Sequence, residues 1–285
     1  MSARDIAELV RLPAALSVPG DALAGAAVTG TLGWRTAGLA ASSTCLYWAG
    51  MALNDYADRD LDAVERPERP IPSGRVSPTT ALSVAGGLTA AGVGLAAVGG
   101  RRALAVAVPL AATVWAYDLL AKPTPLGPVV MAAARGLDVV LGGSADPRRA
   151  APAALALGAH TCAVTVLSRG EVHGSSKPVA SAALATTTAV AAVVAGSGLR
   201  RGRVLARVAS AALAGSYALT VGRAQAAAAA SPDAATVRRA TGTGIRGMVP
   251  LQAALVAGGG AVATAVGLLA AGPALRAAAK GISPT

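Results

Sequence analysis

The sequence predicts an all-α integral membrane protein, a polytopic bundle of about nine transmembrane helices. Hydrophobic residues make up 54% of the 285 residues and charged residues only 14%, which is far more apolar than an ordinary soluble domain. Apolar windows long enough to cross roughly 30 Å of hydrocarbon recur along the whole chain. The polar turns between them are too short to fold independently, so residues 1–285 are expected to form one domain.

The apolar windows are each about 17 to 25 residues long, the length of a transmembrane helix. In order, they fall at 12–32, 36–56, 77–98, 103–119, 126–143, 151–168, 178–197, 204–224 and 247–271. Tight polar turns such as Gly99-Gly100-Arg101-Arg102 separate them. Before the last window, Ser231-Pro232-Asp233 predicts the cap of a short surface helix that ends near Arg238 and Arg239.

The composition also predicts how the helices pack and which functions are excluded. With 34 Gly, no Phe and 2% aromatics, the helices are expected to pack closely through small side chains. Because so few aromatics leave little surface for base stacking, the net charge of +11 indicates membrane-flanking Arg rather than nucleic-acid binding. Cys45 and Cys162 lie in apolar windows without metal-ligand spacing, so we expect small core residues.

One face of the predicted bundle carries most of the acidic residues. If every window spans the membrane, the loops after the second, fourth, sixth and eighth windows share a face with the N-terminus. Most of the fourteen Asp and Glu residues lie on that face, which locates the chemistry there. The distribution of Lys and Arg weakly favours this face as the cytoplasmic one.

The densest negative charge follows the second window, at Asn54, Asp55, Asp58 and Asp62. On a helix, Asn54, Asp58 and Asp62 recur every four residues and share a face over about 12 Å, while Asp55 pairs with Asp58. Two carboxylates about 6 Å apart repel by roughly 3 kcal/mol at an effective dielectric of 20, so a cation is expected between them. Mg²⁺ suits such a site because it accepts one or two carboxylates and takes further ligands from substrate phosphates.

The alternative is a solvated helix end without a metal. In that case the acids would pair with the basic residues of the following segment, which are Arg59, Arg66, Arg69 and Arg75.

The motif Asn54-Asp55-x-x-Asp58-x-x-x-Asp62, followed by Arg66-Pro67-Glu68-Arg69-Pro70-Ile71-Pro72-Ser73-Gly74-Arg75, resembles the first signature of the UbiA superfamily of intramembrane prenyltransferases. The resemblance implies a helical bundle around a central cavity, capped on the cytoplasmic side by the signature loops. It also implies that Asn54, Asp55, Asp58 and Asp62 hold Mg²⁺ on the diphosphate of an isoprenyl donor. The aspartates would act as catalytic residues by helping the allylic C–O bond to ionise.

Basic residues on the same face are candidates for binding the donor. Lys122, in Tyr117-x-x-x-x-Lys122-x-Thr124, resembles the family's Tyr/Lys element. Arg11, Arg66 and Arg69 are also within reach of a diphosphate by sequence, although any of them is equally suited to flank lipid headgroups.

The loop after the sixth window departs from the family pattern. Where most members have two acids four residues apart, this chain reads Ser168-Arg169-Gly170-Glu171-Val172-His173-Gly174-Ser175-Ser176-Lys177. We expect Glu171 to be a catalytic residue and metal ligand, and the substrate-binding residues to include Arg169, His173 and Lys177. With Thr124-Pro125-Leu126-Gly127-Pro128, this loop resembles a divergent UbiA-like branch found in Ebo-type clusters.

Three ionisable residues lie inside predicted spans, namely Asp21, Arg135 and Asp138. Each costs roughly 2.5 to 3.5 kcal/mol to insert, so they should face the protein interior. Arg135 and Asp138 either form a structural ion pair or bind substrate on the acceptor side of the cavity. His160, in the sixth window, is expected to be a hydrogen-bonded core histidine.

These residues lead to two hypotheses of function. The first is a Mg²⁺-dependent prenyltransferase of the cell membrane, with its site loops on the cytoplasmic face, that moves an isoprenyl group from a prenyl diphosphate to a small aromatic or lipid-like acceptor. The second is a non-catalytic carrier, transport or assembly protein that binds a phosphorylated lipid or metabolite. The reduced motif at Glu171 is its main support.

Overall fold

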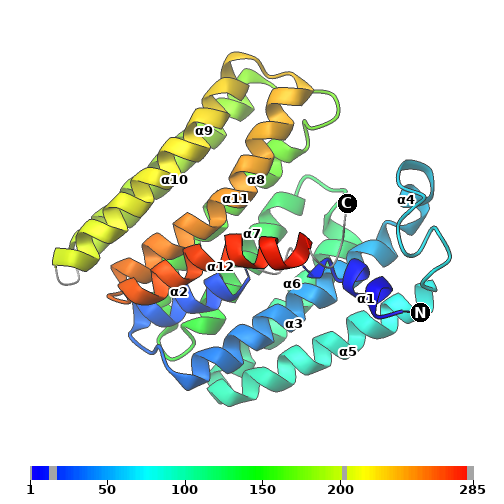
Figure 1. Ribbon diagram of the computed structural model, residues 1–285, viewed down its shortest axis with the longest axis horizontal. Helices are drawn as coiled ribbons and strands as arrows, with labels where there is room; N and C mark the ends of the chain where they lie inside the picture. The colour runs from blue at the N-terminus through cyan, green and yellow to red at the C-terminus, as the bar shows by residue number, and fades with distance from the viewer. Residues whose placement is uncertain (1, 13–17, 201–203, 281–285) are drawn as a thin grey trace.

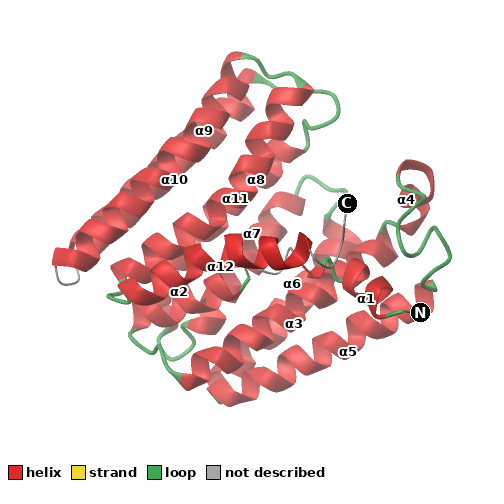
Figure 2. Ribbon diagram, in the orientation of Figure 1, coloured by secondary structure: helices red, strands yellow, loops and turns green. Residues whose placement is uncertain are grey.

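The computed structural model describes residues 2–12, 18–200 and 204–280, and this part of the chain is helical with no strand (Figure 2). The α-helices, with a 3₁₀ turn at Ala97–Gly99 and a π-helical turn at Tyr117–Ala121, are α1 (Ala3–Leu9), α2 (Pro19–Thr29), α3 (Trp34–Ala57), α4 (Arg59–Glu65), α5 (Pro78–Ala96), α6 (Arg101–Ala116), α7 (Gly127–Gly142), α8 (Pro147–Ser168), α9 (Lys177–Arg200), α10 (Val204–Ala230), α11 (Ala234–Gly258) and α12 (Val262–Lys280).

The helices confirm the predicted all-α class. Figure 1 places α8 to α11 on one side of the bundle and α3, α5 and α6 on the other, with α2 and α7 between them. The second to eighth windows coincide with α3 and α5 to α10, and α2 lies within the first window, part of which (13–17) is outside the described residues. Five helices of the described chain are long and apolar enough to cross a membrane: Pro78–Gly99, Arg101–Ala121, Pro147–Ser168, Lys177–Ser197 and Val204–Ala230.

The ninth window is wrong in its boundaries. Asp233 caps a helix as predicted, its side chain accepting from two backbone N–H groups at 3.0 Å, but the helix is α11, which continues for 25 residues. A turn at Gly259-Gly260, with Gly260 at φ 97°, then separates α11 from α12. The arginines of the first turns of α11 hid its continuity because they lower its apolar signal.

The helices pack through small side chains, as the composition predicts. The clearest case is the contact of α2 with α7, where a Cβ added to Gly142 would lie 2.0 Å from the backbone oxygen of Ala22. This contact fixes α7 against α2 and so holds the inward-facing Arg135 and Asp138 of α7 beside Asp21 of α2.

The core of α8, α10 and α11 contains a buried polar chain. The hydroxyl of Tyr217 lies 2.8 Å from Nδ1 of His160, and Nε2 of His160 lies 3.1 Å from the carbonyl oxygen of Gly244. Because that oxygen can only accept, Nε2 donates to it and Nδ1 accepts from Tyr217. His160 is therefore a hydrogen-bonded core residue, as predicted, and Cys45 and Cys162 are both free.

The close contact of α2 and α7 predicts the effect of one methyl group. Gly142→Ala should lower the free energy of unfolding by about 1–3 kcal/mol, because the added Cβ forces the two backbones apart. The matched control is Gly215→Ala on α10, where an added Cβ meets nothing within 4 Å. Unfolding in a denaturing detergent measures both, and equal stability of the two variants would contradict this account of the packing.

Candidate active site

The loops at one end of the bundle are joined by hydrogen bonds. Arg169, after α8, donates to the carbonyl oxygen of Thr124, and the backbone N–H of Ser175 donates to Pro232 at 2.8 Å. Lys122, after the π-helical turn, forms an ion pair with Asp58 at the junction of α3 and α4. The loops after the second, fourth, sixth and eighth windows therefore lie on one face, as the alternation of spans predicts.

Two of the motif carboxylates are buried and share one arginine. Asp55 and Asp62 are only 3% and 2% exposed, and Nη1 of Arg69 lies 3.1 Å from Oδ1 of Asp55 and 2.9 Å from Oδ2 of Asp62. Arg11 donates to Asp55 at 2.8 Å and to Asn54 at 3.1 Å. These acids are therefore not a solvated helix end, although basic residues neutralise them.

The predicted grouping of Asn54, Asp58 and Asp62 on one face is wrong. The four-residue repeat does not continue through the motif, because α3 ends at Ala57 and α4 begins at Arg59, with Asp58 outside helical geometry between them. Asp62 contacts the same guanidinium of Arg69 as Asp55 does. Asn54 and Asp58 instead contact Asp118 and Lys122, which follow α6.

Asp118 lies in this cluster but is not among the site residues predicted from the sequence. It lies in the π-helical turn, is 7% exposed, and its Oδ1 accepts a 3.2 Å hydrogen bond from Nδ2 of Asn54. A π-helical turn commonly marks a functional position because it re-aims the side chains that follow. The available signal was an acid on the same face, between Tyr117 and Lys122 of the Tyr/Lys element.

The donor set of the cluster fits Mg²⁺. In the described part of the chain, no three Asp, Glu, His or Cys side chains converge as a ready-made metal site, because Arg11, Arg69 and Lys122 lie between the acids. Carboxylate and amide oxygens are nevertheless the ligands that Mg²⁺ takes, and it needs only one or two from the protein when phosphates supply the rest. The residues that would hold it are Asn54, Asp55, Asp58, Asp62 and Asp118.

A cavity of about 270 Å³ extends from this cluster into the bundle between α3, α6 and α7. Its mouth is lined by Arg11, Asn54 and Asp118. Its middle is apolar, with Leu46, Gly50, Met51, Val114 and Met131, and its inner end is polar, with Ser43, Tyr47, Arg135 and Asp138.

At the polar inner end, Arg135 and Asp138 do not form the ion pair with each other that their spacing suggests. Arg135 reaches across to α2 and pairs with Asp21, whose other oxygen accepts from Gln252 at 2.7 Å. Asp138 instead accepts a 2.6 Å hydrogen bond from Ser43, and its Oδ1 has no partner among the described residues.

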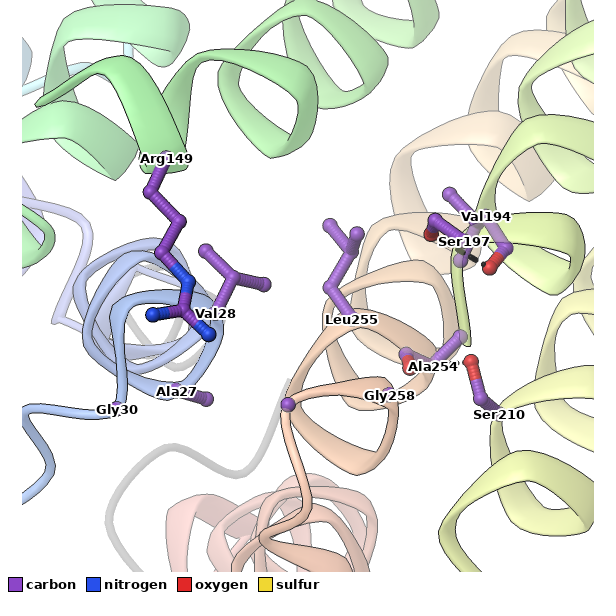
Figure 3. Close-up of a pocket in the computed structure, with 11 residues that line it drawn as sticks. Ala27, Val28, Gly30, Arg149, Val194, Ser197, Ser210, Ala254, Leu255 and Gly258 are labelled. Atoms are coloured by element: carbon purple, nitrogen blue, oxygen red, sulfur yellow. Dashed lines mark hydrogen bonds between the residues drawn. The ribbon is translucent and has the colours of Figure 1, made fainter. Parts of the chain in front are cut away.

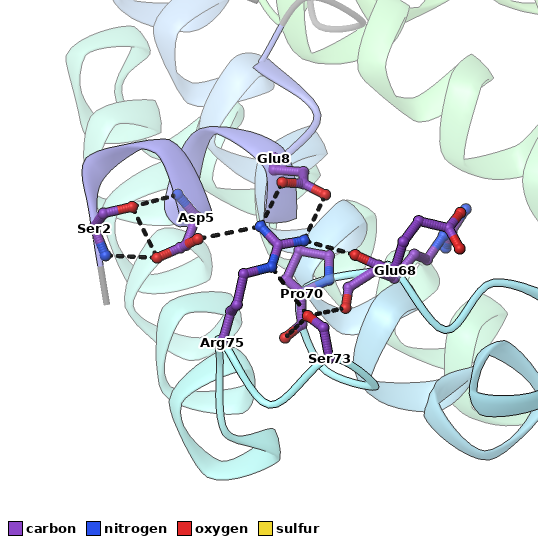
Figure 4. A network of polar contacts seen from close by, with 8 residues as sticks. Ser2, Asp5, Glu8, Glu68, Pro70, Ser73 and Arg75 are labelled. Carbon is purple, nitrogen blue, oxygen red and sulfur yellow. Dashed lines mark hydrogen bonds and ion pairs between the residues drawn. The ribbon is translucent and has the colours of Figure 1, made fainter. Parts of the chain in front are cut away.

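A second polar network holds α1 against the loop that carries Arg69 (Figure 4). Arg75 donates to both carboxylate oxygens of Glu8, at 2.7 and 2.9 Å, to Asp5 at 3.2 Å, and to the carbonyl oxygen of Glu68. Arg11 follows α1 directly and adopts a positive φ of 47°. Arg75 therefore positions the segment that delivers Arg11 to the mouth of the cavity.

The remaining predicted residues lie near the loops but outside this core. Arg66 forms an ion pair with Asp62 at 3.7 Å. Arg169 donates its hydrogen bond to the carbonyl oxygen of Thr124. Glu171 is half-buried, and His173 and Lys177 are exposed. These last three form no ion pair or side-chain hydrogen bond within the described residues, so their roles stay predictions: for Glu171 metal binding and catalysis, for His173 and Lys177 substrate binding.

A separate cavity of about 250 Å³ lies at the opposite end of the helices (Figure 3). It is lined by Arg149 near the start of α8 and by small residues of α2, α9, α10 and α11, without an acidic side chain. Since α8 is about 33 Å long, this cavity is remote from the acidic cluster near its other end.

Together, the fold and the site define a class: a helical membrane protein with a charged mouth that opens into an apolar cavity. Residues 16–231 match the UbiA prenyltransferase family. The chain therefore belongs to this family, in agreement with the resemblance found in its sequence.

Individual relatives agree with this assignment. The chain is 42% identical over 136 residues to the digeranylgeranylglyceryl phosphate synthase of Methanopyrus kandleri, a match that covers 48% of this chain and 49% of that protein. It is 39% identical over 83 residues to the chloroplastic chlorophyll synthase of Oryza sativa subsp. japonica, covering 27% of this chain and 22% of that one. The chain thus spans about half or less of the length of these relatives.

Solved structures share the fold. A UbiA homologue from Archaeoglobus fulgidus bound to DMAPP and Mg²⁺ superposes with a TM-score of 0.67 at 14% identity, covering 90% of this chain and 98% of that one. A structure of digeranylgeranylglyceryl phosphate synthase gives a TM-score of 0.69 at 16% identity, covering 90% and 98%. At these identities the likeness establishes the fold alone.

The shared guanidinium predicts a metal-linked change in stability. Arg69→Met should destabilise the protein by about 3–5 kcal/mol, because it leaves two buried carboxylates without their common partner. Mg²⁺ should then raise the unfolding temperature of the variant more than that of the wild type, since it binds the acids that were freed. Arg59→Met is the control, because Arg59 forms its ion pair with the exposed Asp60, at 3.6 Å, and its hydrogen bond with the carbonyl oxygen of Tyr56 rather than with the buried acids. If Mg²⁺ does not change the unfolding temperature of Arg69→Met, the result would argue against a metal site.

The network around Arg75 predicts a pH dependence of α1. Its hydrogen bond lowers the pKa of Glu8 from the ordinary value of 4.5, so the contact is fully stabilising above that value and is lost as pH falls through the lowered pKa. Hydrogen exchange should show α1 equally protected from about pH 8 to 5 and less protected below about pH 4. Glu8→Gln should weaken this protection at neutral pH and flatten its pH dependence. If the variant retains wild-type protection, Arg75 does not hold α1.

Proposed function

We propose that this protein is a Mg²⁺-dependent intramembrane prenyltransferase, which transfers an isoprenyl group from a prenyl diphosphate to a small aromatic or lipid-like acceptor. One observation carries the proposal: a mouth of buried acids and paired basic residues continues directly into an apolar cavity. This order of chemistry matches a ligand with a diphosphate head and a hydrocarbon tail. The family assignment and the names of the relatives support the same activity.

The mouth contains two kinds of residue that would bind a diphosphate, acidic residues that hold its metal and basic residues that contact its phosphates. Asn54, Asp55, Asp58, Asp62 and Asp118 supply oxygen ligands for Mg²⁺, which would neutralise charge on the leaving diphosphate. Lys122 and Arg11 now pair with Asp58 and Asp55, and each can turn its donors to phosphate oxygens once the metal occupies the acids.

The cavity below the mouth contributes in a different way. When the allylic C–O bond breaks, the electron pair leaves with the diphosphate and the carbon becomes a cation, which water would capture. The apolar middle of the cavity, at Gly50, Met51 and Val114, keeps water from the reacting carbon. The acceptor nucleophile then forms its bond to that carbon and releases its proton.

The names of the relatives say more about the identity of the donor than about the identity of the acceptor. A structural neighbour holds GPP and Mg²⁺, which supports a prenyl diphosphate as the donor for this chain too. The name digeranylgeranylglyceryl phosphate synthase supports a lipid-like acceptor. We further propose that the site loops face the cytoplasm, consistent with the weak bias of Lys and Arg in the sequence.

Release of diphosphate tests the enzyme directly. Purified protein with Mg²⁺, a prenyl diphosphate and a panel of aromatic and lipid-like acceptors should release pyrophosphate. Asp58→Asn should lower this rate at least hundredfold, about 2.7 kcal/mol of barrier, because it removes a charge that holds the metal. The control is Asp60→Asn, whose carboxylate is in the same motif but points to solvent.

Two results would contradict the proposal. Mg²⁺-dependent binding of prenyl diphosphates without turnover of any acceptor would favour the carrier hypothesis. Equal activity of Asp58→Asn and Asp60→Asn would remove the acidic motif from the reaction.

A further inference from the structure

The depth of the cavity contains information on the donor that the motifs do not. Asn54, Gly50, Tyr47 and Ser43 all line it, and they follow one face of α3 from the mouth to the inner end. A helix rises about 1.5 Å per residue, so Tyr47 lies about 10 Å and Ser43 about 16 Å below Asn54. A chain that starts beneath the diphosphate has this length available.

Charged and polar side chains line the inner end of the cavity. Ser43 donates to Asp138, and Arg135 pairs with Asp21, so polar groups from α2, α3 and α7 meet there. Oδ1 of Asp138 is buried and has no partner among the described residues. Hydrocarbon pressed against such groups would displace any water that solvates them, which is costly for buried charges. These residues form a polar floor, consisting of Ser43, Arg135 and Asp138, on which an apolar chain cannot rest favourably.

A role of Asp138 in taking the proton of the acceptor is excluded by the same distances. The bond that breaks lies next to the diphosphate at the level of Asn54, whereas Asp138 contacts Ser43 some 16 Å deeper. The floor therefore meets the far end of the isoprenyl chain.

The depth and the volume of the cavity each limit the length of that chain. Three backbone bonds span about 3.5 Å when extended, so the four chain bonds of an isoprene unit span about 5 Å. Two units therefore reach the level of Tyr47, and about three units reach the polar floor at Ser43. A cavity of about 150 Å³ accepts the six carbons of benzene. At that density the 270 Å³ here, which includes the mouth, holds at most about eleven carbons. A geranyl group has ten carbons in two units.

On the basis of the proposed function, we propose that this protein selects a ten-carbon geranyl donor, because the volume of the cavity limits the chain to about eleven carbons and the polar floor bars any chain longer than about three isoprene units. Gly50 is the point at which the chain leaves the mouth. A Cβ there would lie 3.0 Å from Cγ1 of Val114 and 3.8 Å from Oδ2 of Asp118, so the missing side chain leaves the passage between α3 and α6 open.

Thermal-shift titrations with Mg²⁺ test the proposal without turnover. The ligands are inorganic pyrophosphate and the dimethylallyl, geranyl, farnesyl and geranylgeranyl diphosphates, added to the full chain in one detergent. The wild type should bind geranyl diphosphate at least tenfold more tightly than the geranylgeranyl compound. Tyr47→Ala should reduce this ratio at least threefold, because it removes a ring from the inner half of the cavity. Partition of long chains into micelles is the same for both proteins and cancels in the comparison.

Closing the passage provides the complementary variant. Gly50→Leu should bind geranyl diphosphate no better than pyrophosphate, while pyrophosphate binding stays within threefold of the wild type. Gly215→Leu, on an exposed face of α10 with open space around it, should leave all affinities unchanged. If Gly50→Leu shows no cooperative unfolding, Tyr47→Ala decides the question.

The outcomes separate this inference from the proposed function. Wild-type affinity for geranylgeranyl diphosphate equal to or above that for geranyl diphosphate overturns the chain-length inference and leaves the transferase intact. An unchanged ratio in Tyr47→Ala overturns it as well. Binding of no prenyl diphosphate at all overturns both.

Discussion

The neutralisation of buried carboxylates is the interaction on which the rest of this protein depends. Asp55 and Asp62 lie almost without exposure at the end of α3, where their charges alone would repel strongly. Arg69 spans the two, and Arg11 and Lys122 engage Asp55 and Asp58 from other segments. Segments distant in the sequence are thereby drawn to one mouth.

The same ion pairs explain how a stable site can accept a charged ligand. A salt bridge in a buried place recovers little net free energy after desolvation, so a metal and a diphosphate can replace both partners at modest cost. In the proposed function, the acids would bind the cation and the basic side chains would bind the anion, which would preserve the charge balance. The residues that join these segments are therefore also the residues proposed to bind the ligand, and Arg75 holds one of the segments, α1, in place.

The small side chains of the helices make the cavity possible. Glycines let α2 and α7 approach at backbone distance, and this places Asp21 against Arg135 in the interior. On α3, Gly50 leaves space where a larger residue would close the channel below the mouth. A chain rich in Gly and Ala therefore packs tightly at some contacts and leaves a defined hollow at another.

The sequence by itself determined the helical membrane class, most helix positions and the identity of the acidic motif. These properties are local: apolar length, capping residues and charge spacing need no knowledge of neighbouring helices. The family resemblance depended on the same local spacing and was confirmed over residues 16–231.

Only the tertiary structure decided which charges meet. The contacts of Arg69 with both Asp55 and Asp62, of Arg135 with Asp21 and of Asn54 with Asp118 join different helices or different turns, at sequence separations up to 114 residues. Periodicity gives the face of a single helix but not the rotation of one helix against the next. The depth of the cavity and its polar floor follow from that rotation, because many similar apolar helices have several nearly equivalent faces.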